Sequence, residues 1–260
     1  MTREAPYSGW RDEIGVLALA VQFLTRLPVP RDLAFSEGRL LRATRYYPAV
    51  GVIVGAIGAA VLLGAAAVLP LSVAVLLSMA ATLLATGAFH EDGLADAADG
   101  LGGGLTRERA LEIMRDSRIG TYGTLALGLT LALKAAALMA FAPAQAAALV
   151  VLGHGLSRYA PVAVVARHPY ARETGAKFVA PSVSATGHLV ALATAGALAL
   201  ALALAIGPAA ALAALAGGAL FAALIARAYL RRLGGYTGDC LGATQQMAEL
   251  GLYLGALAWL

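Results

Sequence analysis

The sequence predicts an all-α protein, a polytopic bundle of membrane helices, and three observations support this fold class. Of its 260 residues, 60% are hydrophobic and only 13% are charged, whereas soluble globular domains carry about 25% charged residues. Several apolar runs have the length of roughly 20 residues that a helix needs to cross a bilayer. The basic residues gather between these runs. We expect one domain, residues 1–260, with about six to eight membrane segments.

The positions of the basic residues indicate how the bundle is oriented. Sixteen of the nineteen Lys and Arg residues fall in four stretches: residues 26–45, 107–118, 158–177 and 227–232. Loops rich in Lys and Arg stay on the cytoplasmic side of a membrane. We therefore expect the protein in the cell inner membrane, in contact with membrane lipid, with these loops facing the cytoplasm. This topology accounts for the net charge of +4, and we expect no nucleic-acid partner.

The apolar runs predict the membrane segments in chain order. Residues 14–25 form a short run that ends before Pro28, so this segment lies at the membrane surface, re-enters, or crosses as a short span. Longer runs predict spans at residues 47–69, 71–89, 121–142, 144–166, 189–206 and 209–226. A last run, residues 250–260, is short for a span unless its helix begins near Gly242.

Small residues predict where helices pack closely. Gly51, Gly55 and Gly58 recur at helical spacing in the first long run and form such a face. Because these faces pack helices within one chain or between chains, the sequence leaves a homo-oligomer open. The single cysteine, Cys240, excludes an internal disulfide and a cysteine-based zinc site. The start of the chain lacks the basic region and cleavage site of a signal peptide.

The stretch HEDGLADAADG, residues 90–100, is the strongest candidate site. It places Glu91, Asp92, Asp96 and Asp99 directly after the second long run, and on a helix the three aspartates fall within about 60° of one another. Carboxylates this close repel one another unless a cation lies between them. Oxygen ligands without clustered Cys or His favour Mg²⁺, which proteins use to hold a phosphate or diphosphate. The alternative is a solvated acidic helix end.

A basic stretch is expected beside this carboxylate cluster. We predict an amphipathic helix over residues 106–118, with Thr106 as its N-cap and its apolar face on the membrane surface. The basic stretch RDSRIGTYG, residues 115–123, begins in the last turn of this helix. Arg115 and Arg118 either hold one phosphate together or pair with acidic residues of the same helix.

Three further polar residues have open roles. Asp239, in the polar stretch 236–246, is a metal ligand, an acceptor for a ribose hydroxyl, or the N-cap of a last helix. His90 is a general base or a structural hydrogen-bond donor. Lys134 lies deep in an apolar run, where an interhelical pair or snorkelling is favoured over catalysis. Carboxylates for a metal and Arg for phosphate oxygens together predict phosphoryl transfer, or loss of a diphosphate, at a membrane surface.

Five blocks of the sequence resemble, in order, those of the cobalamin synthase family. The blocks are FLTRLPVP (23–30), FHEDGLADAADG (89–100), LEIMRDSRIGTYG (111–123), SRY (157–159) and TGDCLGATQQMAEL (237–250). They cover nearly the whole chain, and the second and third are highly specific. The resemblance implies a membrane transferase that requires Mg²⁺ and has adenosylcobinamide-GDP ribazoletransferase activity. Such an enzyme joins α-ribazole or its 5′-phosphate to adenosylcobinamide-GDP and releases GMP, late in assembly of the vitamin B12 nucleotide loop.

The resemblance implies the position of the metal and diphosphate site, and the pattern of charged and polar residues suggests roles for the other residues. Asp92, Asp96 and Asp99 are expected to form the metal and diphosphate site, next to Glu91 as a further metal ligand. The expected substrate-binding residues are Arg115, Arg118, Arg158, Thr237 and Asp239. Asp116 or His90 is expected to accept the proton of the attacking ribose hydroxyl.

Other membrane proteins share parts of this pattern. The chain looks distantly like the CDP-alcohol phosphotransferases, whose Asp-x-x-Asp-Gly start is matched by Asp96, Asp99 and Gly100, although the rest of their pattern is not met. A membrane prenyltransferase would carry two comparable Asp-rich clusters, and only one is present in the sequence. A secondary transporter would place ionisable groups at mid-membrane, where we expect only Lys134.

Overall fold

The computed structural model describes residues 9–30, 33, 35–172 and 182–259. Most of the polar segment 1–11 and the end of the basic stretch 158–177, from residue 173 on, lie outside the described residues. Within the described residues the secondary structure is helical, apart from one isolated bridge between Tyr170 and Tyr236. The helices are α1 (Trp10–Leu24), α2 (Glu37–Ala43), α3 (Tyr47–Ala66), α4 (Leu71–Thr86), α5 (Phe89–Gly103), α6 (Arg107–Ile113), α7 (Thr121–Met139), α8 (Pro143–Ser157), α9 (Tyr159–Val165), α10 (Ala185–Ile206), α11 (Pro208–Leu233) and α12 (Gly238–Leu257).

The predicted all-α membrane bundle is confirmed. Among the described residues, five helical segments are long and apolar enough to cross a membrane: Glu37–Ala66, Thr121–Met139, Pro143–Val165, Ala185–Ile206 and Pro208–Leu233. The pair α4 and α5 passes the same test, but it is bent by 88° at its break. Since α5 turns away from the axis of α4, we take α4 as the sixth crossing and α5 as a helix across its end. Six crossings are the lower limit of the expected range.

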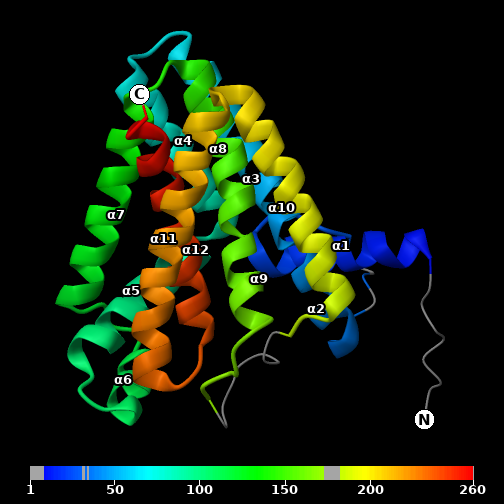
Figure 1. Ribbon diagram of the computed structural model, residues 1–260, viewed down its shortest axis with the longest axis vertical. Helices are drawn as coiled ribbons and strands as arrows, with labels where there is room; N and C mark the ends of the chain where they lie inside the picture. The colour runs from blue at the N-terminus through cyan, green and yellow to red at the C-terminus, as the bar shows by residue number, and fades with distance from the viewer. Residues whose placement is uncertain (1–8, 31–32, 34, 173–181, 260) are drawn as a thin grey trace.

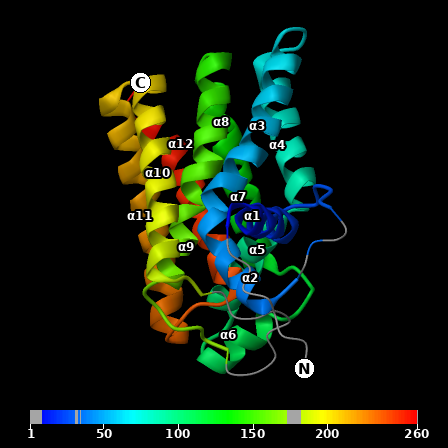
Figure 2. The same cartoon turned by 90° about the vertical axis from the view of Figure 1, so that its right-hand side faces the viewer.

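The long helices run side by side along one axis (Figures 1 and 2). The helices α2 and α6 lie at one end of the bundle, which we call the α6 end. The basic stretches around α2 and α6 therefore share this end, as the sequence predicts. Helix α12 begins at Gly238, is largely buried and packs against α5, α7, α8 and α11. The apolar run at residues 250–260 is therefore the end of a longer central helix, which is one of the alternatives that the sequence left open.

Helix α1 does not cross the bundle in parallel with the others. Figure 1 shows α1 from the side and Figure 2 shows it nearly end-on, so it lies across the long axis. Asp12 ties it to α2 by accepting hydrogen bonds from Arg39 Nε at 2.9 Å and from Arg42 Nη1 at 2.5 Å. Of the three alternatives for residues 14–25, this geometry favours a helix lying at the membrane surface.

Glycines set the closest helix contacts. A Cβ atom added at Gly51 would lie 2.1 Å from the carbonyl oxygen of His154, and one at Gly55 would lie 2.6 Å from the Cα atom of Val151. These α3 positions therefore let the backbone of α8 approach closely, which confirms the predicted packing face. Between α11 and α12, a Cβ atom at Gly251 would lie 2.3 Å from the carbonyl oxygen of Gly217.

The turn between α4 and α5 directs the carboxylate stretch across the bundle. Gly87 and Ala88 both have left-handed backbone angles, with φ of 66° and 57°, and between them the chain turns by 88° from α4 to α5. A Cβ atom at Gly87 would lie 2.1 Å from Arg26 Nε, so glycine is needed there for both the backbone angle and the space. The predicted span 71–89 therefore ends at Thr86.

One helix boundary differs from the prediction. Thr106 caps α6 by accepting a hydrogen bond from Arg109 N at 3.2 Å, as expected, but the helix ends at Ile113 instead of continuing to residue 118. The backbone amides of Arg115 and Asp116 bond to carbonyls three residues earlier, which tightens the last turn and ends the helix. Helix α5 ends at Gly103, with Gly104 as its C-cap.

Candidate active site

A cavity of about 550 Å³ opens at the α6 end of the bundle. Its lining comes from α1, α2, α3, α5 and α12, from the segment after α6, and from the break between α8 and α9. Most of these segments are far apart in the sequence. This volume is typical of a pocket for a drug-sized ligand, and the lining contains both charged and aromatic side chains.

The carboxylates in the cavity come from two helices. Asp92 and Asp96 lie one turn apart on α5, and Asp239 lies in the first turn of α12. The two helices approach through Gly93, where a Cβ atom would lie 3.0 Å from the carbonyl oxygen of Asp239. Burial, followed by the charges of Asp92 and Asp239, raises the pKa of Asp96 to about 7. The raised pKa is consistent with the repulsion that the sequence predicts within the carboxylate cluster.

Asp99 and Glu91 point elsewhere. Asp99 accepts hydrogen bonds from the backbone amides of Gly120 at 2.7 Å and Gly123 at 2.8 Å, so both of its oxygens hold the N-terminus of α7. Glu91 is buried, and its Oε1 atom accepts a hydrogen bond from Gln246 at 2.7 Å. Neither residue lines the cavity. The sequence places all four acids on α5, but the structure brings only Asp92 and Asp96 into this cavity.

A divalent cation in this cavity would need ligands from a substrate. In the part of the chain that the structure describes, no three His, Cys, Asp or Glu side chains form a group that holds a metal ion by itself. Proteins commonly bind Mg²⁺ through one or two carboxylates together with substrate phosphates. Asp92 and Asp96, with Asp239 beside them, fit that arrangement because all three offer hard oxygen ligands and repel one another without a cation.

Three arginines line the cavity: Arg115, Arg158 and Arg172. Arg172 donates a hydrogen bond to Asp239 at 2.8 Å. Arg158 is only 1% exposed, and its Nε atom is buried without a hydrogen-bond partner among the described residues. A buried guanidinium with an unused donor suits an anionic ligand such as a phosphate.

Asp116 and Arg118 form an exposed pair after α6. Arg118 Nη2 donates to Asp116 at 2.7 Å, and hydrogen bonds from the side chain and backbone of Arg118 lower the pKa of Asp116 to about 2. Asp116 lines the cavity and Arg118 does not. Of the two alternatives for Arg118, the structure therefore favours pairing with an acid of its own segment, and this pairing makes Asp116 a weak proton acceptor.

His90 has the properties of a neutral base. It lines the cavity from the first turn of α5 and is only 5% exposed. Burial and the nearby charge of Arg158 lower its pKa well below its usual value. A neutral imidazole keeps one nitrogen free to accept a proton.

Thr237 holds α12 in place next to the cavity. Its hydroxyl oxygen accepts a hydrogen bond from Cys240 N at 3.3 Å, so Thr237, and not Asp239, is the N-cap. The Thr237 hydroxyl also donates to Asp239 Oδ2 at 3.2 Å. Thr237 is fully buried and is absent from the cavity lining, so its contact with the cavity is through Asp239.

Sequence reasoning missed an apolar part of the lining. Its members are Phe23, Leu24, Leu40, Leu41, Tyr47 and Phe89. The ring of Phe23 stacks on Tyr47 with centroids 6.2 Å apart and meets the edge of Phe89 at 5.5 Å. Phe23 and Phe89 are each the first residue of one of the blocks that carry the family resemblance. This position is the sequence signal that could have identified them as part of the site.

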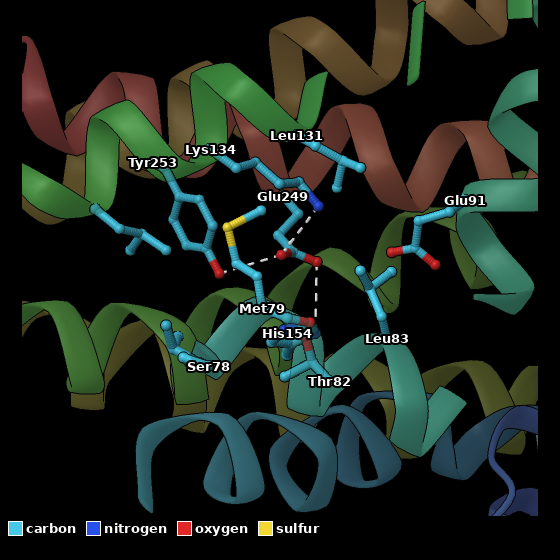
Figure 3. Close-up of a pocket in the computed structure, with 12 residues that line it drawn as sticks. Ser78, Met79, Thr82, Leu83, Glu91, Leu131, Lys134, His154, Glu249 and Tyr253 are labelled. Atoms are coloured by element: carbon cyan, nitrogen blue, oxygen red, sulfur yellow. Dashed lines mark hydrogen bonds and ion pairs between the residues drawn. The ribbon is translucent and has the colours of Figure 1, made fainter. Parts of the chain in front are cut away.

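Sequence reasoning also missed a buried polar network in the bundle core. Lys134 forms the expected interhelical pair, and its partner is Glu249 on α12 at 3.0 Å. Figure 3 shows Lys134, His154 and Tyr253 converging on the Glu249 carboxylate, with Glu91 pointing into the same space. A lysine within an apolar run implies a buried acid, but the sequence does not tell which acid it is.

Comparison with known proteins decides the family. Residues 16–257 match the family described as cobalamin-5-phosphate synthase. The chain belongs to this family. Its relatives in the cobalamin-5-phosphate synthase family extend over nearly the same length, so the resemblance predicted from five sequence blocks is confirmed.

Three relatives carry the name adenosylcobinamide-GDP ribazoletransferase. The protein from Leptothrix cholodnii is 50% identical over 253 residues, which cover 95% of this chain and 96% of the relative. The protein from Ralstonia pickettii is 45% identical, covering 96% and 98%, and one from Vibrio cholerae is 41% identical, covering 96% of each. No solved structure matches the chain, so the geometry above is the basis for assigning roles to its residues.

Proposed function

We propose that the chain is an adenosylcobinamide-GDP ribazoletransferase. In this reaction α-ribazole, or its 5′-phosphate, attacks adenosylcobinamide-GDP and GMP leaves, which completes the nucleotide loop of the cobalamin. The observation that carries the proposal is the cavity at the α6 end, because it combines the carboxylates Asp92, Asp96 and Asp239 with the guanidinium groups of Arg115 and Arg158. The names of the relatives support the same reaction.

Asp92 and Asp96 are the proposed ligands for Mg²⁺, with Asp239 next to them. The elevated pKa of Asp96 supports this role, because a bound cation would relieve the repulsion that raises it. When bound, Mg²⁺ would neutralise diphosphate oxygens and the charge that develops on the leaving group. Asp99 and Glu91, which the sequence also suggests as ligands, would support the site by fixing α5.

Arg115 and Arg158 are the proposed contacts for the diphosphate. Each guanidinium can donate two parallel hydrogen bonds to phosphate oxygens, and the unused donor of Arg158 is available for one of them. Arg172 is engaged with Asp239, so its proposed role is to orient that carboxylate. The arginines would thus hold the phosphorus atom in line with the attacking hydroxyl.

His90 is the proposed proton acceptor. A ribose hydroxyl oxygen of the ribazole forms a bond to the cobinamide-side phosphorus, and the bond from that phosphorus to the bridging oxygen of GMP breaks. The hydroxyl proton passes to the free ring nitrogen of His90, which is neutral in this cavity. Asp116 was the other candidate, but its carboxylate is already paired with Arg118.

The apolar lining is the proposed site for the base of the ribazole. Phe23, Tyr47 and Phe89 present aromatic surface, and a flat aromatic base stacks on such surface. The cavity has the volume of one drug-sized ligand, whereas a corrinoid with its nucleotide is several times larger. The corrin ring would therefore stay outside the cavity while its diphosphate arm enters.

The proposed location is the cell inner membrane with the cavity open to the cytoplasm. The basic stretches at the α6 end support this orientation through the positive-inside rule. Both substrates are large and polar and would reach the cavity from the cytoplasm without crossing the bilayer.

The test is GMP release by the purified protein in nanodiscs, with adenosylcobinamide-GDP and α-ribazole as substrates. We expect turnover that requires Mg²⁺ and falls by about a hundredfold or more in Asp92→Asn and Asp96→Asn. Glu108→Gln is the matched control, since Glu108 is an exposed acid on α6 outside the cavity.

Other outcomes would point to the alternatives. Turnover of a prenyl diphosphate in place of adenosylcobinamide-GDP would indicate a prenyltransferase. Solute uptake into liposomes without chemical conversion would indicate a transporter. Native GMP release by both aspartate variants would contradict the proposed metal site.

A further inference from the structure

A buried polar network connects the core of the bundle to one residue of the cavity. Glu249 on α12 is surrounded by Lys134 Nζ at 3.0 Å, Tyr253 Oη at 3.2 Å, Gln245 Nε2 at 2.7 Å and His154 Nδ1 at 3.4 Å. Figure 3 shows three of these partners around the carboxylate. We call these five residues the Glu249 network. None of them lines the 550 Å³ cavity.

Stability alone does not account for this network. Lys134 and Glu249 are each 3% exposed, and burying two charges costs several kcal/mol per ion before their attraction offsets it. Apolar residues of similar volume are often at least as stable in such a position. Ionisable residues inside a membrane protein therefore suggest a functional role.

The link to the cavity runs through His154. Its Nδ1 atom lies 3.4 Å from Glu249 Oε2 and 3.2 Å from Arg158 Nη1. A guanidinium only donates hydrogen bonds and a carboxylate only accepts them. The Nδ1 atom can therefore bond to Glu249 only when it carries a proton, and to Arg158 only when it does not. The two contacts exclude each other.

The choice between these contacts decides how Arg158 is held. In the structure Arg158 Nη1 lies 3.2 Å from Nδ1, within hydrogen-bond distance of an unprotonated ring nitrogen. With Nδ1 protonated, the ring donates to Glu249, and Arg158 Nη1 must move away from the ring N–H while it keeps its bond to the His154 carbonyl oxygen at 2.9 Å. The rest of the guanidinium then stays available to the cavity that Arg158 lines. With Nδ1 unprotonated, this nitrogen accepts a hydrogen bond from Arg158 Nη1, in addition to the bond that Nη1 donates to the His154 carbonyl oxygen. These two bonds hold the guanidinium towards the core of the bundle.

We propose that Glu249 keeps His154 in the Nδ1–H tautomer and thereby positions Arg158 for its phosphate ligand. A charged acceptor next to Nδ1 favours the proton on that nitrogen, and Lys134 keeps Glu249 charged. Glu249 is a positioning residue, since it acts through His154 and contacts no substrate. This inference rests on the proposed function, in which the ligand of Arg158 is the diphosphate of adenosylcobinamide-GDP.

The main test replaces the ion pair as a whole, in the double variant Lys134→Met/Glu249→Met. Replacing both partners leaves no unpaired charge in the core, so we expect thermal unfolding close to that of the native protein. GMP release should nevertheless fall about tenfold to a hundredfold in kcat, because Arg158 is misplaced, while KM for α-ribazole stays within about twofold. Thr82→Val is the control. Thr82 lines the small core cavity beside Glu249 but bonds to the carbonyl oxygen of Met79 in its own helix, so native turnover is expected.

A second measurement determines the tautomer of His154 independently of enzyme activity. In protein labelled with ¹⁵N-histidine, the ring nitrogens of His154, assigned by their loss in His154→Gln, should report Nδ1–H in the native protein and Nε2–H in the double variant. An Nε2–H ring in the native protein would overturn the inference, as would native kcat in a folded double variant. Absence of GMP release from the native protein would instead contradict the proposed function and leave the tautomer result standing.

Discussion

The three aspartates of α5 differ in what their oxygens contact, and this difference predicts different losses on substitution. Asp99 accepts two backbone hydrogen bonds at the start of α7, where the helix dipole also favours a negative charge. In Asp99→Asn, the side-chain NH₂ group would take the place of one of these oxygens. One backbone N–H would then face a hydrogen-bond donor instead of an acceptor. We expect the free energy of unfolding to fall by about 1–3 kcal/mol, measured by chemical or thermal unfolding in detergent.

Asp92→Asn provides the comparison for this prediction. Asp92 lines the cavity, and no hydrogen bond ties it to another helix among the described contacts, so its variant should lose GMP release without losing stability. Asp99→Asn should keep more turnover per folded molecule than Asp92→Asn. Native stability together with complete loss of turnover in Asp99→Asn would instead make Asp99 a direct ligand.

The pKa of Asp96 predicts how cation binding depends on pH. Burial and the neighbouring charges of Asp92 and Asp239 raise this pKa to about 7, so the side chain is protonated below pH 7 and ionised above it. Mg²⁺ competes with that proton. We expect the affinity for Mg²⁺ to fall by up to about tenfold for each pH unit below 7 and to level off above pH 8.

Isothermal titration calorimetry between pH 6 and pH 8 measures this dependence. In Asp92→Asn one source of repulsion is removed, so the pKa of Asp96 should fall and the pH dependence should shift to lower pH, although the affinity itself is weaker. An affinity that does not change between pH 6 and pH 8 would exclude Asp96 as a ligand.

At the scale of helices, the contact between α3 and α8 is the one most sensitive to volume. In Gly51→Ala the added Cβ atom would meet the carbonyl oxygen of His154 at 2.1 Å, so the backbone of α8 must move. We expect a loss of about 1–3 kcal/mol in unfolding free energy. GMP release should also fall, since α8 carries His154 and ends next to Arg158.

Gly64→Ala is the matched control on the same helix. A Cβ atom there meets nothing within 4 Å, and replacing glycine by alanine within a helix stabilises it by about 0.5–1 kcal/mol. Thermal unfolding of both variants in the same detergent gives the comparison. Equal stability of the two variants would mean that α3 and α8 do not pack as closely as the backbone distances indicate.

Some elements could be predicted from local sequence and others could not. Thr106 predicts the start of α6. The end of α6 at Ile113 depends on how the chain turns towards α7, where Asp99 accepts a hydrogen bond from Gly120 N. For α12, the sequence left open whether the helix reaches back from its apolar end to about Gly242. Its polar first half is buried because Gln245, Gln246 and Glu249 find partners on α5, α7 and α8, and such partners are not encoded by spacing.

The candidate site shows the same division. Charge and spacing identify Asp92 and Asp96 from the sequence, because a carboxylate stripe is a local pattern. The aromatic lining around Phe23 and the role of Arg172 depend on contacts between α1, α3, α5 and α12, which only the folded chain brings together.

The molecule as a whole places its basic loops and its cavity at the same end, and this predicts its topology in the membrane. Ser117 lies in the cavity lining after α6, and Val68 is 81% exposed in the turn between α3 and α4, at the other end of the bundle (Figure 1). The native Cys240 is buried, so it should contribute little background labelling. Single variants Ser117→Cys and Val68→Cys therefore report the two ends separately.

A membrane-impermeant maleimide should label Val68→Cys from the periplasmic side in spheroplasts and should label Ser117→Cys only in inverted vesicles. The positive-inside rule gives this direction, because it predicts that the Arg-rich ends of α2, α6 and α11 stay in the cytoplasm. Adenosylcobinamide-GDP should slow the labelling of Ser117→Cys in inverted vesicles, since it would occupy the same cavity, and should leave Val68→Cys unaffected. The reverse pattern would place the cavity in the periplasm, where the nucleotide substrate is not supplied, and would contradict both the orientation and the proposed reaction.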